Sequence, residues 1–292
     1  MRNVKKYLTL LLLSAGLAAC TTASRSDFGG MTFSSDPLVG KIVWHDLITE
    51  DLDSARDFYA GLFGWTFEAS RGARGEEYVL ARKGNTIVAG LLGIDAPDDG
   101  QDYSRWLPYI SVDDVDAALA RAIATGGEVA VDTREVNIGE VAAIIDPQGA
   151  VIGLSFSDIG DPDDLTTAPG PGKPVWTELL ADDPRAAAAF YGSVAGYQTR
   201  IIERRGGEFI ILSSGGVDRA SMFENPAAGN YKPVWLTAFG VEDPAAAAAS
   251  AEALGGTLIL PVTPDLRDGT TAVVTDPSGA ILVLQAWMTG GA

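Results

Sequence analysis

The same order of apolar and polar positions occurs four times along this chain. Each occurrence starts with a short β-rich segment whose apolar positions alternate, and continues with an acidic residue and an Ala-rich helical segment that ends at Gly. Two or three further apolar strands close it. The four occurrences begin at Trp44, Trp106, Trp176 and Trp235. We therefore predict an α+β fold built from four βαβββ units.

The ends of the four helices can be predicted from their flanking residues. Aspartate accepts hydrogen bonds from free backbone N–H groups at a helix start, and Gly adopts the left-handed conformation that ends many helices. The predicted N-caps are Asp51 or Asp53, Asp113 or Asp114, Asp183 and Asp243. The predicted ends are Gly61 or Gly64, Gly126, Gly196 and Gly255.

Odd and even units differ in a way that pairs them. The first and third carry Phe-Tyr late in the helix, at 58–59 and 190–191, whereas the second and fourth carry Asp-Pro-x-Gly turns at 146–149 and 276–279. A segment rich in Pro, Gly and Asp separates the two pairs. We predict modules at 38–157 and 173–288 with a linker at 158–172, packed together as one compact pseudo-dimer.

The pattern of the N-terminal residues indicates a targeting segment. Basic residues precede a short apolar stretch, which makes 1–19 a signal peptide that is too short to span a bilayer comfortably. The residues 17–20, Leu-Ala-Ala-Cys, resemble the lipobox of bacterial lipoproteins, and Cys20 is the only cysteine in the chain. We predict lipidation of Cys20, a flexible tether at 20–37, and a lipid anchor in the bacterial cell envelope facing the periplasm. Thr21 favours the outer membrane; a secretory signal cleaved after Ala is the alternative.

Charge narrows the range of partners. The formal net charge is −18 with 47% hydrophobic residues. Such an acidic surface repels phosphate backbones and anionic headgroups. We expect no nucleic acid partner, and membrane contact through the lipid alone.

The helix pattern D-x-x-x-A-x-x-F-Y with a later D-P-x-G strand resembles the vicinal oxygen chelate superfamily. That family includes glyoxalase I, extradiol dioxygenases and bleomycin resistance proteins. The resemblance implies that paired units curl their sheets into open cups, with helices outside and the ligand inside the cup.

The resemblance also implies where metal ligands would stand. The family's first-strand histidine aligns with Trp44 and Trp176, and with Leu107 and Leu236 in the even units. Its last-strand glutamate aligns with Gly153 and Val283. Because none of these side chains ligates metal, we predict no metal and no other cofactor.

His45, the only histidine, stands one position away from the family's ligand. Side chains alternate along a strand, so we expect His45 to face the outer helices with Val43 and Leu47 rather than the cup. A β-bulge would turn it inward, but a single imidazole is too few ligands for a metal site.

The cup-facing positions also include the acidic residues Asp46 and Glu178, and Tyr109. Aromatic walls beside a carboxylate suit a cationic or aromatic small molecule. The leading hypothesis is a non-catalytic binding lipoprotein, with the aligned cup positions, Asp46, Glu178 and Tyr109 as ligand contacts and no catalytic residue. The alternatives are a metal-dependent lyase or dioxygenase and a structural lipoprotein with closed cups. Acid–base catalysis by Asp46 or Glu178 also remains open, although nothing in the sequence indicates a raised pKa.

Overall fold

The computed structural model describes residues 32–71, 77–95, 103–136, 138–164, 170–204, 207–226, 228 and 232–287. The predicted signal peptide, Cys20 and most of the predicted tether lie outside these residues. Among the described residues, no helix combines the length and apolar character needed to cross a bilayer.

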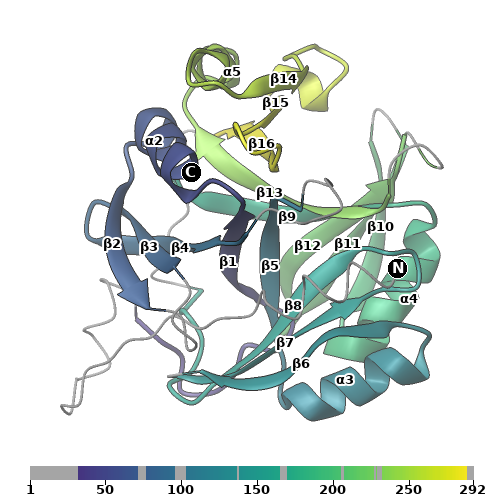
Figure 1. Ribbon diagram of the computed structural model, residues 1–292. Helices are drawn as coiled ribbons and strands as arrows, with labels where there is room; N and C mark the ends of the chain where they lie inside the picture. The colour runs from purple at the N-terminus through teal and green to yellow at the C-terminus, as the bar shows by residue number, and fades with distance from the viewer. Residues whose placement is uncertain are drawn as a thin grey trace.

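Four units of one strand, one helix and three further strands follow each other along the chain (Figure 1). The first module contains β1 (Ile42–Thr49), α2 (Leu52–Phe63), β2 (Thr66–Arg71), β3 (Glu77–Lys83), β4 (Thr86–Gly93), β5 (Arg105–Ser111), α3 (Val115–Ala124), β6 (Glu128–Val136), β7 (Gly139–Ile145) and β8 (Val151–Ser157). The second contains β9 (Pro174–Ala181), α4 (Pro184–Ala195), β10 (Gln198–Arg204), β11 (Gly207–Ser214), β12 (Val217–Glu224), β13 (Val234–Val241), α5 (Pro244–Ala253), β14 (Thr257–Leu260), η1 (Arg267–Gly269), β15 (Thr271–Thr275) and β16 (Ile281–Ala286). The predicted α+β fold of four βαβββ units is confirmed.

Each module forms one eight-stranded sheet. The strand order is β2-β3-β4-β1-β5-β8-β7-β6 in the first and β10-β11-β12-β9-β13-β16-β15-β14 in the second. The first strands of the two units pair antiparallel at the centre, as β1 with β5 and β9 with β13. Each first strand also pairs in parallel with the last strand of its own unit. Both modules therefore have an internal two-fold arrangement with β1 and β5, or β9 and β13, in the middle.

The helix starts match the predicted aspartates and resolve their ambiguities. Asp51, Asp114, Asp183 and Asp243 cap the four helices, each accepting a hydrogen bond from a backbone N–H of the first turn. At the ends of α2 and α4, Gly64 and Gly196 take positive φ angles of 66° and 71°. Gly61 lies inside α2 instead of ending it, and packs against Leu254 of the second module.

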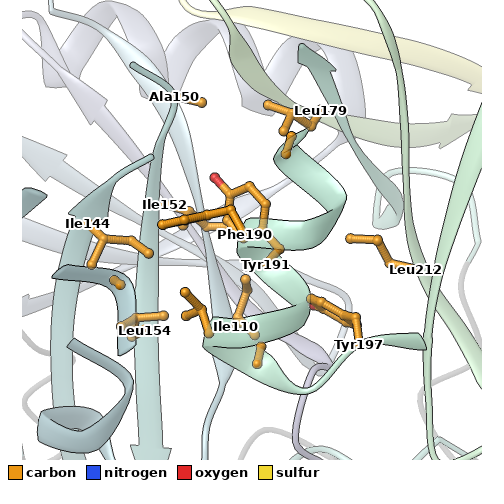
Figure 2. Close-up of a cluster of buried hydrophobic side chains, with 14 of the residues drawn as sticks. Ile110, Ile144, Ala150, Ile152, Leu154, Leu179, Phe190, Tyr191, Tyr197 and Leu212 are labelled. Atoms are coloured by element: carbon orange, nitrogen blue, oxygen red, sulfur yellow. The ribbon is translucent and has the colours of Figure 1, made fainter. Parts of the chain in front are cut away.

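The two modules share their hydrophobic cores. One buried cluster combines β5, α3 and β8 of the first module with β9, α4 and β11 of the second, through residues such as Ile110, Leu154, Tyr191 and Leu212 (Figure 2). The other combines α2 and β4 with α5 and β16. Accordingly, α3 lies beside α4 and α2 beside α5 (Figure 1). The predicted compact pseudo-dimer is confirmed.

The repeated motifs contact each other across the module boundary. The Tyr59 hydroxyl on α2 donates to Asp276 Oδ2 at 3.1 Å and accepts the Trp106 indole N–H at 2.9 Å. Tyr191 on α4 repeats the arrangement with Asp146 at 3.1 Å and Trp235 at 2.9 Å. The Phe-Tyr and Asp-Pro-x-Gly motifs are therefore joined in space as structural contacts between modules.

Where they are described, the segments predicted as tether and linker contact each other, and the linker contacts both modules. Ser34 N donates to Asp161 O at 2.8 Å, and Phe33 forms a β-bridge with Pro162. Trp65 Nε1 donates to Gly172 O at 2.7 Å. The last residues of the predicted tether, 32–37, are thus held by backbone contacts to 161–163 and do not form a free segment.

Candidate functional site

The concave face of the first sheet is built from alternating residues of β1 and β5. Trp44 and Ile48 of β1 belong to one apolar cluster with Leu107 and Tyr109 of β5. Leu47 of β1 belongs to the opposite cluster, beneath the helices. The pleat of β1 therefore places Trp44 and Asp46 on the cup side, the side expected from the sequence.

Val43 departs from this alternation. The register between β1 and β5 shifts between Ile42 and Trp44, so Val43 and Trp44 both border the cup. The expectation that Val43 faces the helices was wrong, because a local register shift cannot be inferred from strict alternation.

Asp46 is the polar centre of the first cup. Its side chain is buried, and its Oδ1 accepts the Trp44 indole N–H at 2.7 Å and the Tyr78 hydroxyl at 2.8 Å. The hydroxyl of Tyr109 is a further hydrogen-bond partner. Burial raises the pKa of Asp46 to about 6, although the hydrogen bonds from Trp44, Tyr78 and Tyr109 oppose the shift. Nothing in the sequence indicated this shift, because it results from the burial of the carboxylate in the folded cup.

Two glycines make room for this arrangement. A Cβ atom on Gly90 would collide with the Tyr78 hydroxyl and the Asp46 carboxylate, and one on Gly153 would collide with the ring of Tyr109. Gly90 stands directly beside Asp46 on β4, and Gly153 directly beside Tyr109 on β8. Residues with no side chain thus allow two tyrosines to lie across the cup wall and approach the same carboxylate.

A cavity of about 120 Å³ adjoins Asp46. Its wall is apolar and aromatic apart from a few polar groups, and includes Trp44, Asp46, Tyr78, Tyr109 and Phe156. Phe33 and residues 160–162 also line it, so the chain segment before β1 helps to enclose the cup. Leu107 and Gly153 belong to the cup wall but do not border this cavity.

The second cup is arranged differently. Trp176 Nε1 donates to Ser221 Oγ at 2.9 Å, so this tryptophan does not contact the neighbouring carboxylate through its N–H. Glu178 is buried and forms an ion pair with Arg267, whose guanidinium lies 5.8 Å from the centroid of the Phe223 ring. Leu236 and Val283 belong to the apolar wall of this cup.

The cup side chains do not fit a divalent metal. Among the described residues, no three His, Cys, Asp or Glu side chains come together as a candidate metal site. Asp46 is already held by three aromatic donors and Glu178 by a guanidinium, which leaves each cup without converging free ligands. No step of chemistry through a metal can be derived from these residues.

His45 faces away from the first cup and contacts the other module. Its Nε2 lies 3.1 Å from Thr177 Oγ1 of β9, and both residues border a cleft of about 340 Å³ between the modules. Burial lowers the pKa of His45 to about 3, so the ring is neutral. The expected side was right, but His45 contacts a strand of the second module rather than the outer helices.

The sequence reasoning did not select Tyr78, Gly90 or Arg267. Tyr78 and Gly90 approach Asp46 because β3, β4 and β1 are neighbours in the sheet. The β-rich pattern of 77–83 signals the strand but not its pairing partner. Arg267 comes from a turn between β14 and β15, where no periodicity fixes the direction of the side chain.

Comparison with known proteins places this fold in a family. The sequence profile of the Glyoxalase/Bleomycin resistance protein/Dioxygenase superfamily matches residues 41–154 and 173–284. The chain belongs to this superfamily. Both modules carry the match, and each matched segment contains one whole eight-stranded sheet apart from its last strand residues.

Individual members of the superfamily resemble the chain over most of its length. A protein named "Putative glyoxylase CFP32" of Mycobacterium tuberculosis is 34% identical over 245 residues, covering 82% of this chain and 91% of the relative. "Anthracycline biosynthesis protein DnrV" of Streptomyces peucetius is 29% identical over 253 residues with the same coverage.

Solved structures of the superfamily share the fold. A Mn(II)-bound glyoxalase from Novosphingobium aromaticivorans has a TM-score of 0.54 and 17% identity, covering 85% of this chain and 82% of its own. The 2,3-dioxygenase LapB from Pseudomonas sp. KL28 has a TM-score of 0.56 and 15% identity, covering 87% and 95%. At these identities the likeness concerns the fold alone.

Proposed function

We propose that this superfamily member is a metal-free, non-catalytic binding protein whose first cup takes a small molecule with a cationic or hydrogen-bond-donating group. The observation that carries the proposal is Asp46: a buried carboxylate, bordering a cavity, between the rings of Trp44, Tyr78 and Tyr109. A cation there gains both ion pairing and contact with aromatic faces.

The size of the cavity limits the ligand. About 120 Å³ is below the roughly 300–1,000 Å³ typical of sites for drug-sized molecules. A compact ammonium group fits this volume, whereas a larger ligand inserts one end or requires Phe33 to move aside. The relatives named for anthracycline biosynthesis support including planar aromatic molecules among the ligands tested.

Binding can be measured with benzyltrimethylammonium as a cationic probe and an uncharged molecule of similar shape as its partner. Trp44→Ala and Asp46→Asn are expected to weaken binding of the cation by about tenfold or more, because each removes a direct contact. His45→Ala, on the same strand but the opposite face, is the control and should bind as the unchanged protein does. Equal affinity for the charged and uncharged probes would contradict a role for Asp46.

The natural ligand can be sought in the protein purified from its own periplasm. Native mass spectrometry is expected to show a retained small molecule and no stoichiometric metal. One metal per module, lost on His45→Ala, would contradict the proposal in favour of a metal-dependent lyase or dioxygenase. Empty protein that binds no probe would favour a structural lipoprotein.

A second candidate function is metal-free acid–base catalysis by Asp46. The raised pKa of Asp46 favours it, because a carboxyl group that titrates near neutral pH can exchange protons with a bound substrate. The two candidates separate in Asp46→Asn: a catalyst would lose turnover of a bound substrate while still binding uncharged analogues.

We also propose that the protein is anchored in the envelope through a lipid on Cys20, with the outer membrane favoured. The support is the basic and apolar leader followed by Leu-Ala-Ala-Cys. Mass spectrometry of the mature N-terminal peptide is expected to show an acylated Cys20, and Cys20→Ala should release the protein from membranes. An unmodified mature chain that starts at another residue would contradict the anchor.

A further inference from the structure

The second cup contains a cation supplied by the chain itself. Arg267 reaches from the turn between β14 and β15 to Glu178, and its guanidinium lies over the ring of Phe223. The Glu178 side chain is 2% exposed and that of Arg267 is 23% exposed. The charged group of Arg267 is thus engaged by an acid and an aromatic ring, and part of this side chain remains in contact with solvent.

Glu178 occupies the place in its module that Asp46 occupies in the first. Each follows a cup tryptophan by two positions, Trp44 or Trp176. Asp46 pairs with Gly90 and Leu107 across its neighbouring strands, and Glu178 pairs with Ser221 and Leu236. The two carboxylates are therefore equivalent positions of two related cups.

The two carboxylates have different hydrogen-bonding partners. Ser221 stands where the first cup has Gly90, and it takes the tryptophan N–H that Asp46 receives in the first cup. Ala238 stands opposite Trp176, where Tyr109 stands opposite Trp44.

Phe209 stands opposite Phe223 on β12, in the place that Tyr78 has opposite Leu92 on β4. The second cup thus lacks the two tyrosine donors that surround Asp46, and its tryptophan N–H goes to Ser221 instead of the carboxylate. Among the described residues, Arg267 donates the hydrogen bond that Glu178 accepts.

The turn that carries Arg267 has an unusual backbone. Arg267 and Asp268 have φ angles of 49° and 54°, and Gly269 follows with 80°. Residues with side chains seldom adopt this left-handed region, and they stay in it where surrounding contacts hold them. The ion pair with Glu178 is such a contact, so Arg267 enters the cup from a short strained turn rather than from a strand of its wall.

We propose that the second cup is a binding site for a guanidinium group, that the chain fills this site with Arg267, and that a small guanidine takes its place when Arg267 is withdrawn. Arg267 donates to Glu178 through Nη2 while its guanidinium lies over the ring of Phe223, so the site offers a carboxylate beside an aromatic face. A primary ammonium has no flat face to lie against the ring, so the site distinguishes guanidines from amines.

Arg267→Gly tests the proposal, because glycine suits the positive φ and leaves the cup empty. Titration with methylguanidinium is done in an Asp46→Asn background, so that the carboxylate of the first cup does not contribute. The added Arg267→Gly is expected to tighten binding by about tenfold, followed by the Trp176 indole N–H signal in NMR. Adding Glu178→Gln should abolish the gain, and methylammonium should bind more weakly than methylguanidinium. Arg200→Ala, which removes an exposed ion pair with Asp218, is the matched control and should show no gain.

Different outcomes of these titrations would contradict the proposal. A folded Arg267→Gly protein that binds methylguanidinium no better than its parent would overturn it, as would a gain that survives Glu178→Gln. If Arg267→Gly does not fold alone, methylguanidinium at millimolar concentration is expected to restore its NMR spectrum while methylammonium does not. Failure of that rescue would also overturn the proposal. None of these outcomes depends on ligand binding in the first cup.

Discussion

His45 and Asp46 are neighbours on β1 with opposite environments. His45 is buried between modules and contacts Thr177, whereas Asp46 borders the cavity of the first cup. Burial disfavours the charged form of both, which lowers the pKa of the imidazole to about 3 and raises that of the carboxyl to about 6. Both shifts can be measured in solution.

Asp46 is expected to make the protein less stable as pH rises. The folded protein holds this proton more tightly than the unfolded chain, in which the pKa is near 3.8. The stabilisation is complete below about pH 4 and is lost as pH rises through about 6, a change of about 3 kcal/mol. Asp46→Asn removes this titration, so the free energy of unfolding of the variant relative to the unchanged protein should rise by about that amount between about pH 4 and 7.

Urea denaturation at a series of pH values measures this difference. Asp57→Asn is the control, because Asp57 is exposed on α2 and its substitution makes the same chemical change outside the cup. Parallel profiles for Asp46→Asn and the unchanged protein would show that the pKa of Asp46 is not raised.

His45 is expected to stay neutral throughout the physiological range. Because it is the only histidine, the protein has a single imidazole Cε1–H signal in its NMR spectrum. That signal should not move between about pH 5 and 8, since the folded-state pKa is far below the ordinary value near 6.5. Because burial disfavours the charged ring, the stability of the folded protein should be full above about pH 6.5 and should fall as pH falls from about 6.5 towards 3. A titration midpoint near 6.5 would place His45 in contact with water.

At the scale of elements, the repeated Phe-Tyr and Asp-Pro-x-Gly motifs hold the helix of one module against the other module. The Phe58 ring packs where Gly256 leaves space in the other module, and Phe190 packs likewise beside Gly127. The tyrosine that follows each phenylalanine bonds to the aspartate of the opposite module's Asp-Pro-x-Gly turn. The motifs therefore serve the packing of the modules and do not line the cups.

Tyr191→Phe is expected to destabilise the protein by about 1–3 kcal/mol, because it leaves the buried Trp235 indole N–H without its acceptor. Tyr59→Phe should cost a similar amount, and the two costs should add, since the residues lie in separate clusters. Urea denaturation of both single variants and the double variant measures this. A double variant no less stable than either single variant would mean that the clusters are coupled.

The units and helix caps could be predicted because they depend on local sequence. Asp114 and Asp243 precede helices whose free N–H groups need an acceptor, whatever the strand order. The cup positions Trp44, Asp46 and Tyr109 followed from strand parity combined with the family resemblance. The approach of Tyr78 to Asp46 depends on long-range register instead, and the contact of Arg267 with Glu178 depends on one strained turn, neither of which leaves a local signal.

At the scale of the whole molecule, the hydrophobic clusters beneath the helices are built from residues of both modules. The cluster around Tyr191 includes Ile110 and Leu154, and the cluster around Tyr59 includes Phe239 and Leu284. A separated first module would expose these apolar faces to water.

The full chain is therefore expected to unfold in one transition, with coincident midpoints by far-UV circular dichroism and tryptophan fluorescence. Fragments 38–157 and 173–288, made separately, should be unfolded or self-associated, and should recover native fluorescence on mixing. Two well-separated transitions, or a monomeric folded fragment, would show that each module is stable on its own.

The bonds from Tyr59 to Asp276 and from Tyr191 to Asp146 have a consequence for how such a chain can evolve. After a duplication that joins two modules, a substitution in either Asp-Pro-x-Gly turn changes the packing of the helix in the other copy. Selection therefore acts on the scaffold of both copies together. The cups line the other face of each sheet and escape that joint constraint. In this chain one copy surrounds its carboxylate with aromatic donors and the other pairs its carboxylate with an arginine, while both keep the tyrosine–aspartate bond between modules.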